Sequence, residues 1–216
     1  MDYCLCGIAI DFDGDQPLPF PTCTDHPATR TDLPWVRLHQ QQNLAHTVDD
    51  EQLGVLDDRQ LDLQYGGWLF RLEASRESIA YQRRLVTGLD LPLAHVLERM
   101  ILPVYATVAV EANLCLHAGC VVVDGRAWLL IGDTGAGKST TVYTLMRDYD
   151  AQLAADEMAV VDVDELLVKP TAPALRLDRR RELPEAVDQG TIHPEIDKKW
   201  FRFAPSRIAR GPAPIG

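Results

Sequence analysis

The residues of this chain best suited to chemistry form a glycine-rich run: Gly132, Asp133, Thr134, Gly135, Ala136, Gly137, Lys138, Ser139 and Thr140. The run fits the pattern GxxxxGK[ST], in which glycines let successive backbone N–H groups turn inward around phosphate oxygens. Lys138 would bring a mobile charge to the β and γ phosphates, Ser139 would offer a hydroxyl to Mg²⁺, and a helix beginning near Gly137 would add its positive dipole end. The run predicts a nucleoside triphosphate site, against the alternative of a plain glycine-rich turn before a helix.

Two acids, Asp156 and Glu157, follow this run after the short apolar segment 153–155. An acid at such a strand end could hold Mg²⁺, directly or through water, or accept the proton of an attacking hydroxyl. The spacing from Lys138 to these acids is much shorter than the spacing from the loop to the second acid of many GTPases and ATPases. This short spacing favours a compact phosphotransferase. The alternative is a solvated pair of acids at a strand end.

The elements expected around these residues follow the order of a nucleotide-binding α/β unit. Residues 114–123 and 126–131 predict two apolar strands about Asp124-Gly125, a pair suited to a type I′ turn. Apolar residues at 142, 145, 146 and 149 mark one face of a helix, and residues 153–155 predict a further strand. Strand, glycine loop, helix, strand and acid therefore succeed one another.

The first 90 residues predict a small antiparallel β module. Strands are expected at 3–11, 35–39, 61–65, 68–73 and 78–83, with a hairpin at Gly66-Gly67 and a proline-rich loop after the first strand. Residues 91–113 carry apolar side chains at helical spacing and predict a largely buried helix kinked at Pro103. The expected domains are a β-rich module (1–90), a connecting helix (91–113) and an α/β P-loop core with a basic C-terminal segment (114–216).

The second half of the chain resembles the HPr kinase/phosphorylase family over about residues 113–163. In that family a strand carrying a histidine, a hairpin, a GDSGxGKS loop and a strand ending in Ala-Asp-Asp occur in this order. The matching segments here are 116–119 (LHAG), 122–125 (VVDG), 130–139 (LIGDTGAGKS) and 153–157 (LAADE). Glu157 differs from the family pattern, which has aspartate at that position.

The resemblance implies an ATP- and Mg²⁺-dependent serine kinase whose P-loop core is similar to that of phosphoenolpyruvate carboxykinase. It implies that Asp156 deprotonates the acceptor serine, that Ser139 and Glu157 lie on the Mg²⁺ side, and that His117 is an active-site histidine. Lys138 would act on the transferred phosphate. The alternative for His117 is an ordinary strand histidine satisfied by a neighbour.

The overall layout, a short β module followed by a helix and this core, resembles the small HPr kinase-like proteins of peptide natural-product pathways, including lasso peptide maturation. The implied partner is a peptide or protein that carries an acceptor serine, such as a precursor peptide. Six basic residues could grip phosphates or a peptide carboxylate: Arg176, Arg179, Arg180, Arg181, Lys198 and Lys199. Two other functions stay open, a kinase for a small metabolite such as free serine and a nucleotide-dependent binding module without transfer.

Composition narrows the class of protein. With 46% hydrophobic and 25% charged residues, the chain is typical of a globular domain, and its net charge of −11 argues against nucleic acid as a partner. Its start has no basic region before the apolar residues, and no apolar run is long enough to cross a bilayer, so we expect a cytoplasmic protein without a membrane partner. Self-association stays open. Cys4, Cys6, Cys23 and His26 have side chains suited to tetrahedral zinc, but Cys4 and Cys6 could equally be apolar residues on one face of a strand.

Overall fold

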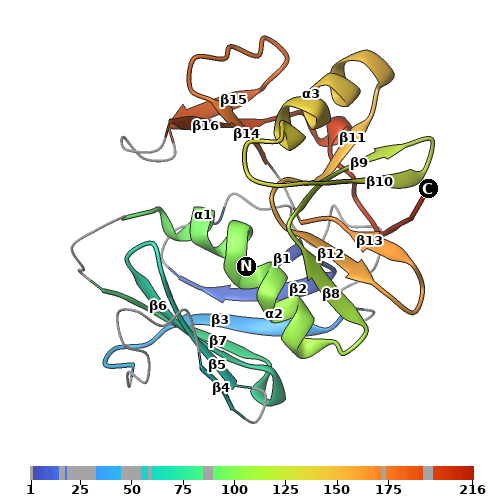
Figure 1. Cartoon of the computed structure of the whole chain (residues 1–216). Helices are drawn as coiled ribbons and strands as arrows, with labels where there is room; N and C mark the ends of the chain where they lie inside the picture. Colours follow the sequence, from blue (N-terminus) through green and yellow to red (C-terminus); the bar gives the residue numbers. More distant parts are fainter. Residues whose placement is uncertain are drawn as a thin grey trace.

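A computed structural model of the chain describes residues 2–14, 18, 33–44, 55–57, 60–84, 90–171, 174–191 and 197–216. The fold is mixed α/β, with mostly strands and few helices. One large sheet is built from the N-terminal part and three smaller sheets from the C-terminal part, with a helical segment between them (Figure 1).

The N-terminal sheet has seven strands in the order β1-β2-β3-β7-β6-β5-β4. Their bounds are β1 Asp2–Leu5, β2 Ile8–Asp13, β3 Trp35–Gln40, β4 Val55–Asp57, β5 Gln60–Tyr65, β6 Trp68–Glu73 and β7 Ser78–Arg83. The 3-10 turn Ala74–Arg76 joins β6 to β7. The predicted hairpin at Gly66-Gly67 is confirmed, because β5 and β6 pair antiparallel on either side of it.

The antiparallel expectation is wrong at the centre of this sheet, where β3 runs parallel to both of its neighbours, β2 and β7. Two parallel strands need a long connection between them, and the chain has such a connection for each of the two parallel pairs. About 20 residues separate β2 from β3, and the β4–β6 meander separates β3 from β7. The sheet is therefore mixed.

The first predicted strand is two strands joined by a tight turn. Cys6 and Gly7 both have positive φ, 59° and 70°, so the chain reverses there and β1 pairs antiparallel with β2. This turn is tied to the C-terminal part, since the Cys6 amide donates to the Pro170 carbonyl at 2.8 Å. Cys6 consequently lies in a turn, and the expectation that Cys4 and Cys6 share one face of a strand is wrong.

The connecting helix is continuous from residue 93 to 109 but is not regular. It consists of α1 Leu93–Val96, a π-helical turn Leu97–Ile101 and α2 Leu102–Ala109. The Leu102 amide donates to the Leu97 carbonyl, five residues back, immediately before Pro103, which has no N–H to donate. The helix packs on the N-terminal sheet, where it joins a core that includes Phe70, Leu72 and Ile79.

The predicted strand 114–123 divides at His117 into β8 Asn113–Leu116 and β9 Ala118–Val123, which belong to different sheets. The first of these sheets has the order β17-β13-β12-β8, where β12 is Ala159–Asp162, β13 is Leu167–Lys169 and β17 is Ala213–Pro214. The second has the order β10-β9-β11, where β10 is Arg126–Ile131 and β11 is Gln152–Ala155. A type I′ turn needs positive φ at both central residues, and Asp124 and Gly125, which lie between β9 and β10, both have it.

The other elements of the C-terminal part are β10 Arg126–Ile131, α3 Lys138–Tyr149, β11 Gln152–Ala155, β12 Ala159–Asp162, β13 Leu167–Lys169, β14 Ala174–Asp178, β15 Asp188–Thr191, β16 Lys198–Arg202, the 3-10 turn Pro205–Arg207 and β17 Ala213–Pro214. Strands β10 and β11 both pair antiparallel with β9, so they run parallel to each other with β9 between them. Helix α3 connects them. Among the residues that the structure describes, no helix combines the length and apolar character needed to cross a membrane.

Candidate functional site

The glycine loop, residues 132–137, leaves the end of β10 and leads into the first turn of α3. Gly135 and Gly137 both have φ of +88°, and the space where a Cβ would stand is open at each. Glycine is therefore needed there for its backbone conformation, as predicted, and not for close packing. The Lys138 ammonium crosses the loop and donates to the carbonyls of Gly132 at 2.7 Å and Asp133 at 3.2 Å.

The candidate site lies where two chain segments, 116–120 and 155–159, pass side by side from the sheet that contains β8 and β12 to the sheet that contains β9 and β11. On one side of this crossing Leu116 pairs with Ala159, in β8 and β12. On the other side Cys120 pairs with Ala155, in β9 and β11. Residues 117–119 and 156–158 lie opposite each other between these two pairs, so His117 and the two predicted acids belong to the same crossing.

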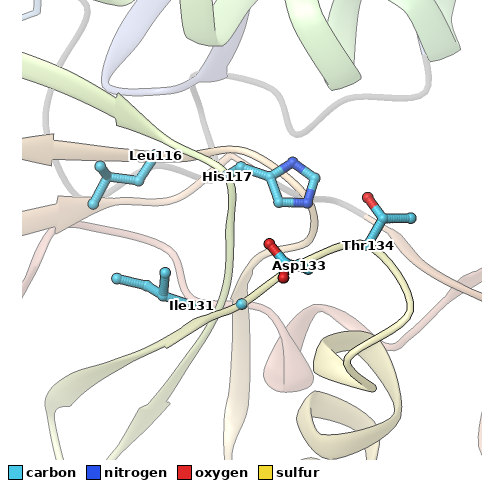
Figure 2. A pocket seen from close by; sticks show the side chains of 6 residues that line it. Leu116, His117, Ile131, Asp133 and Thr134 are labelled. Atoms are coloured by element: carbon cyan, nitrogen blue, oxygen red, sulfur yellow. The ribbon is translucent and has the colours of Figure 1, made fainter.

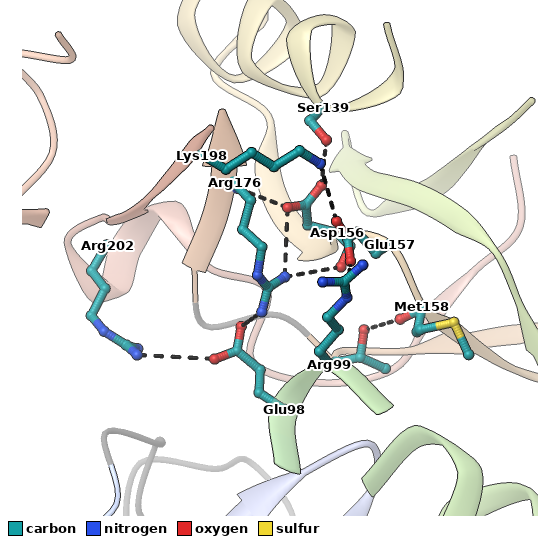
Figure 3. Close-up of polar contacts among 10 residues, drawn as sticks. Glu98, Arg99, Ser139, Asp156, Glu157, Met158, Arg176, Lys198 and Arg202 are labelled. Carbon is teal, nitrogen blue, oxygen red and sulfur yellow. Dashed lines mark hydrogen bonds and ion pairs between the residues drawn. The ribbon is translucent and has the colours of Figure 1, made fainter. Parts of the chain in front are cut away.

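Asp156 is buried, and its carboxylate is held from two sides (Figure 3). Ser139 donates its hydroxyl to Oδ1 at 2.7 Å, and the backbone amide of Arg176 donates to Oδ2 at 2.8 Å. The sequence placed Ser139 and Asp156 on neighbouring elements, and the structure brings them into direct contact. Ser139 contacts Asp156 and not Glu157, although the resemblance paired Ser139 with Glu157.

The pKa of Asp156 is raised above its usual value. Burial is the largest cause and the nearby Glu157 charge adds to it, while the Arg176 charge and the hydrogen bond from Ser139 act in the opposite direction. A raised pKa moves a carboxylate toward the working range of a general base.

Glu157 lies beside Asp156 in a different electrostatic setting. Its carboxylate pairs with Arg99 through Oε2 and accepts a hydrogen bond from Lys198 at 3.3 Å through Oε1. Burial tends to raise its pKa, but the charges of Arg99, Arg176 and Lys198 outweigh that effect and the net shift is downward. Glu157 also has a φ of +81°, an unusual value for a residue with a Cβ, so the backbone is strained beside the site.

His117 is exposed and lines an open pocket of about 430 Å³ (Figure 2). The pocket is bounded by the start of the glycine loop and by the ends of β8 and β10: Leu116, His117, Ile131, Gly132, Asp133 and Thr134. Leu116 and Ile131 give it an apolar side, and Asp133, Thr134 and His117 give it a polar one. His117 is thus beside the glycine loop, and its role as an active-site histidine stays a prediction.

The basic residues of the C-terminal segment divide into two groups. Arg176 is buried beside Asp156, so it is not a surface cation. Arg179 and Arg180 are exposed and pair with Asp197 and Asp178 at 2.5 and 2.6 Å. Their predicted contact with a peptide or phosphate stays a prediction, and they would have to exchange these pairs to make it.

The donor atoms around Ser139 fit Mg²⁺. A hydroxyl and a carboxylate lie in contact at the start of α3, and Mg²⁺ prefers oxygen ligands, commonly one or two carboxylates together with substrate phosphates and water. No three His, Cys, Asp or Glu side chains gather as a metal site within the described ranges. For the zinc hypothesis, Cys4 and Cys6 are buried free thiols, and Cys23 and His26 lie outside the described residues.

Two residues of the site were not singled out from the sequence, Glu98 and Arg99. Both come from the π-helical turn; Arg99 pairs with Glu157, and Glu98 contacts Arg176 and Arg202, as Figure 3 shows. The available signal was a charged pair inside an apolar helical run, where a soluble helix would bury only apolar side chains.

Comparisons with family models, with curated proteins and with solved structures find no match to this chain.

Proposed function

We propose that the protein is an ATP-dependent serine kinase with a P-loop core of the HPr kinase type. The observation that carries the proposal is the contact between Ser139, at the start of the helix that follows the glycine loop, and the buried carboxylate of Asp156. A phosphate-binding loop joined to an acid at the end of a neighbouring strand is the arrangement that phosphoryl transfer requires. The reaction would take place in the cytoplasm.

In this proposal the glycine loop holds the phosphates of ATP through its backbone N–H groups, and Lys138 moves from the loop carbonyls to the β and γ phosphates. Mg²⁺, held by Ser139 with Asp156 or Glu157, would neutralise charge on the β and γ oxygens. His117 faces the same loop and would contact the transferred group or the acceptor.

The transfer is an in-line displacement. The acceptor serine oxygen attacks the γ phosphorus, the bond from that phosphorus to the β–γ bridging oxygen breaks, and ADP leaves with the bonding electrons. Asp156 takes the serine proton. Its Oδ1 accepts one hydrogen bond, from Ser139, so a lone pair is left for the incoming hydroxyl.

The proposed acceptor is a serine in a peptide or protein, such as the precursor of a lasso-type peptide. The open form of the pocket beside the glycine loop supports an acceptor larger than a metabolite, since a free amino acid is usually bound in an enclosed cavity. A kinase for free serine is the second candidate, and it would use the same residues.

Intact-mass spectrometry of serine-containing peptides after incubation with the protein and Mg²⁺-ATP tests the proposal. We expect a gain of one phosphate, which Asp156→Asn reduces by about 10²–10⁴-fold because it removes the base. The variant should still bind nucleotide, whereas Lys138→Ala should weaken both nucleotide binding and transfer. Asp164→Asn, at an exposed acid in the turn after β12, is the matched control.

Each other outcome separates the candidates. Transfer to free serine and to no peptide would favour the metabolite kinase. ATP binding without transfer to either would favour the binding module. Full turnover by Asp156→Asn would remove Asp156 from the role of base.

A further inference from the structure

The helix that links the two parts of the chain reaches the acids through two adjacent residues. Glu98 and Arg99 lie on the π-helical turn, far in sequence from the glycine loop, and both side chains point toward the acid pair (Figure 3). Glu98 is buried, which is rare for a glutamate unless it is paired.

Glu98 acts on Asp156 through Arg176. The Arg176 guanidinium donates through Nη2 to Glu98 Oε1 at 2.8 Å, and both side chains are almost fully buried. The same arginine donates through its backbone amide to Asp156 Oδ2 at 2.8 Å and through Nη1 to the Asp156 carbonyl at 3.4 Å. Arg176 therefore lies between two buried acids and fixes one relative to the other.

Arg99 makes the parallel contact with the second acid. Its Nε pairs with Glu157 Oε2, on the opposite carboxylate oxygen from Lys198. Neighbouring residues of an α-helix point well apart around its axis, but the widened π turn changes this spacing and lets positions 98 and 99 both face the site. Single π turns in helices occur frequently at functional sites.

Stability alone does not account for this network. Replacing a buried ion pair by well-packed apolar residues often leaves a protein equally stable, because the desolvation cost offsets the attraction. What apolar side chains cannot do is hold a carboxylate in one orientation, which requires directional donors.

We propose that Glu98 and Arg99 are positioning residues of the phosphoryl-transfer site, Glu98 holding Asp156 through Arg176 and Arg99 holding Glu157 directly. This inference rests on the proposed kinase function. It adds that the connecting helix is part of the catalytic apparatus and not only a support for the core.

Kinetics of Glu98→Gln test the proposal on the intact protein. The change keeps the side-chain shape and removes the charge. We expect kcat to fall about 10–100-fold, as for other residues that orient a site through a second group, while the KM for ATP and the nucleotide Kd change less than about threefold. Glu111→Gln, at an exposed acid just after α2, is the control and should leave kcat unchanged.

A double variant shows whether Glu98 acts through Arg176. In an Arg176→Met background, Glu98→Gln should lower kcat no further, because the link is already broken. Equal fold-losses of kcat from Glu98→Gln in both backgrounds, or an unchanged kcat in Glu98→Gln, would overturn the proposal. If Glu98→Gln does not fold, Arg176→Lys tests the same link, since it keeps the charge but cannot contact both acids.

A second readout does not need catalysis. The Arg176 amide reports directly on Asp156, so in Glu98→Gln we expect its hydrogen exchange to be at least about tenfold faster, while the amides of Val160 and Val161 in β12 are unchanged. If the wild-type protein transfers no phosphate but Glu98→Gln speeds exchange of the Arg176 amide, the kinase proposal is wrong and the link from Glu98 through Arg176 to Asp156 stands. If the wild-type protein is a kinase and Glu98→Gln changes neither kcat nor this exchange rate, only the link is wrong.

Discussion

At the scale of single residues, Asp156 has the environment that a buried charge needs. A carboxylate removed from water is costly unless donors and an opposite charge compensate it, and Asp156 has a hydroxyl, an amide and the Arg176 guanidinium within reach. Of these three groups, only the Ser139 hydroxyl would also bind the proposed Mg²⁺. In the proposed kinase, nucleotide, metal and base would therefore meet at Ser139.

Ser139→Ala should lower the Mg²⁺-dependent part of ATP affinity about tenfold, because it removes a Mg²⁺ ligand and a donor to Asp156. Titration of a fluorescent ATP analogue with and without Mg²⁺ measures this. Ser139→Thr keeps the hydroxyl and should restore binding, and Thr141→Ala, at an exposed position two residues further along α3 and on another face of the helix, should have little effect. Equal Mg²⁺ dependence in Ser139→Ala and wild type would contradict the assignment.

At the scale of elements, the fit of α3 against β9 places Ser139, at the start of α3, against Asp156. Gly119 allows this close approach. A Cβ at position 119 would meet Val142 Cγ2 of α3 at 2.9 Å, and Lys138 and Ala155 lie within 4 Å of the same point. Because valine is stiff at χ1, the helix itself would have to move.

Gly119→Ala should therefore destabilise the protein by about 1–3 kcal/mol, the usual range for overpacking a tight core, and should weaken ATP binding through the shift of α3. Urea unfolding and nucleotide titration measure the two effects. Val142→Ala removes the clashing methyl groups, so the double variant should be at least about 0.5 kcal/mol more stable than the sum of the single changes predicts. Strict additivity would show that α3 does not rest on position 119.

At the scale of the whole molecule, the buried charges around the helical segment make stability depend on pH. His95, in α1, is buried with an unpaired Nε2 atom. Burial, with the charges of Arg176 and Arg99, lowers its pKa from 6.5 to about 3, although Glu157 acts in the opposite direction.

Between these two pKa values the unfolded chain binds a proton at His95 and the native protein does not. The contribution of neutral His95 is fully present above about pH 6.5 and is lost as the pH falls toward 3. In His95→Gln the free energy of unfolding should fall less steeply over this window, by about 1 kcal/mol per pH unit. Urea unfolding at a series of pH values measures both slopes, and identical slopes would mean that His95 is protonated in the native protein.

The elements that the sequence predicted well depend on local chemistry. The turns at Gly66-Gly67 and Asp124-Gly125, and the glycine loop before α3, require positive φ at particular positions, and the residues there meet that requirement by themselves. The helix 138–149 and its neighbouring strands follow from the spacing of apolar residues. A glycine loop between a strand and a helix, followed by two acids at the end of the next strand, could therefore be predicted before the structure was known.

The tertiary structure decided which distant segments meet. A strand pattern does not specify its partner, so the parallel position of β3 and the division of residues 113–123 between two sheets at His117 were not predictable. Glu98 reaches Arg176, and Arg99 reaches Glu157, only because the helix packs across both parts of the chain. Local preferences depend on a few neighbouring residues, whereas these contacts depend on the burial of the whole core, and that is why only the folded molecule reveals them.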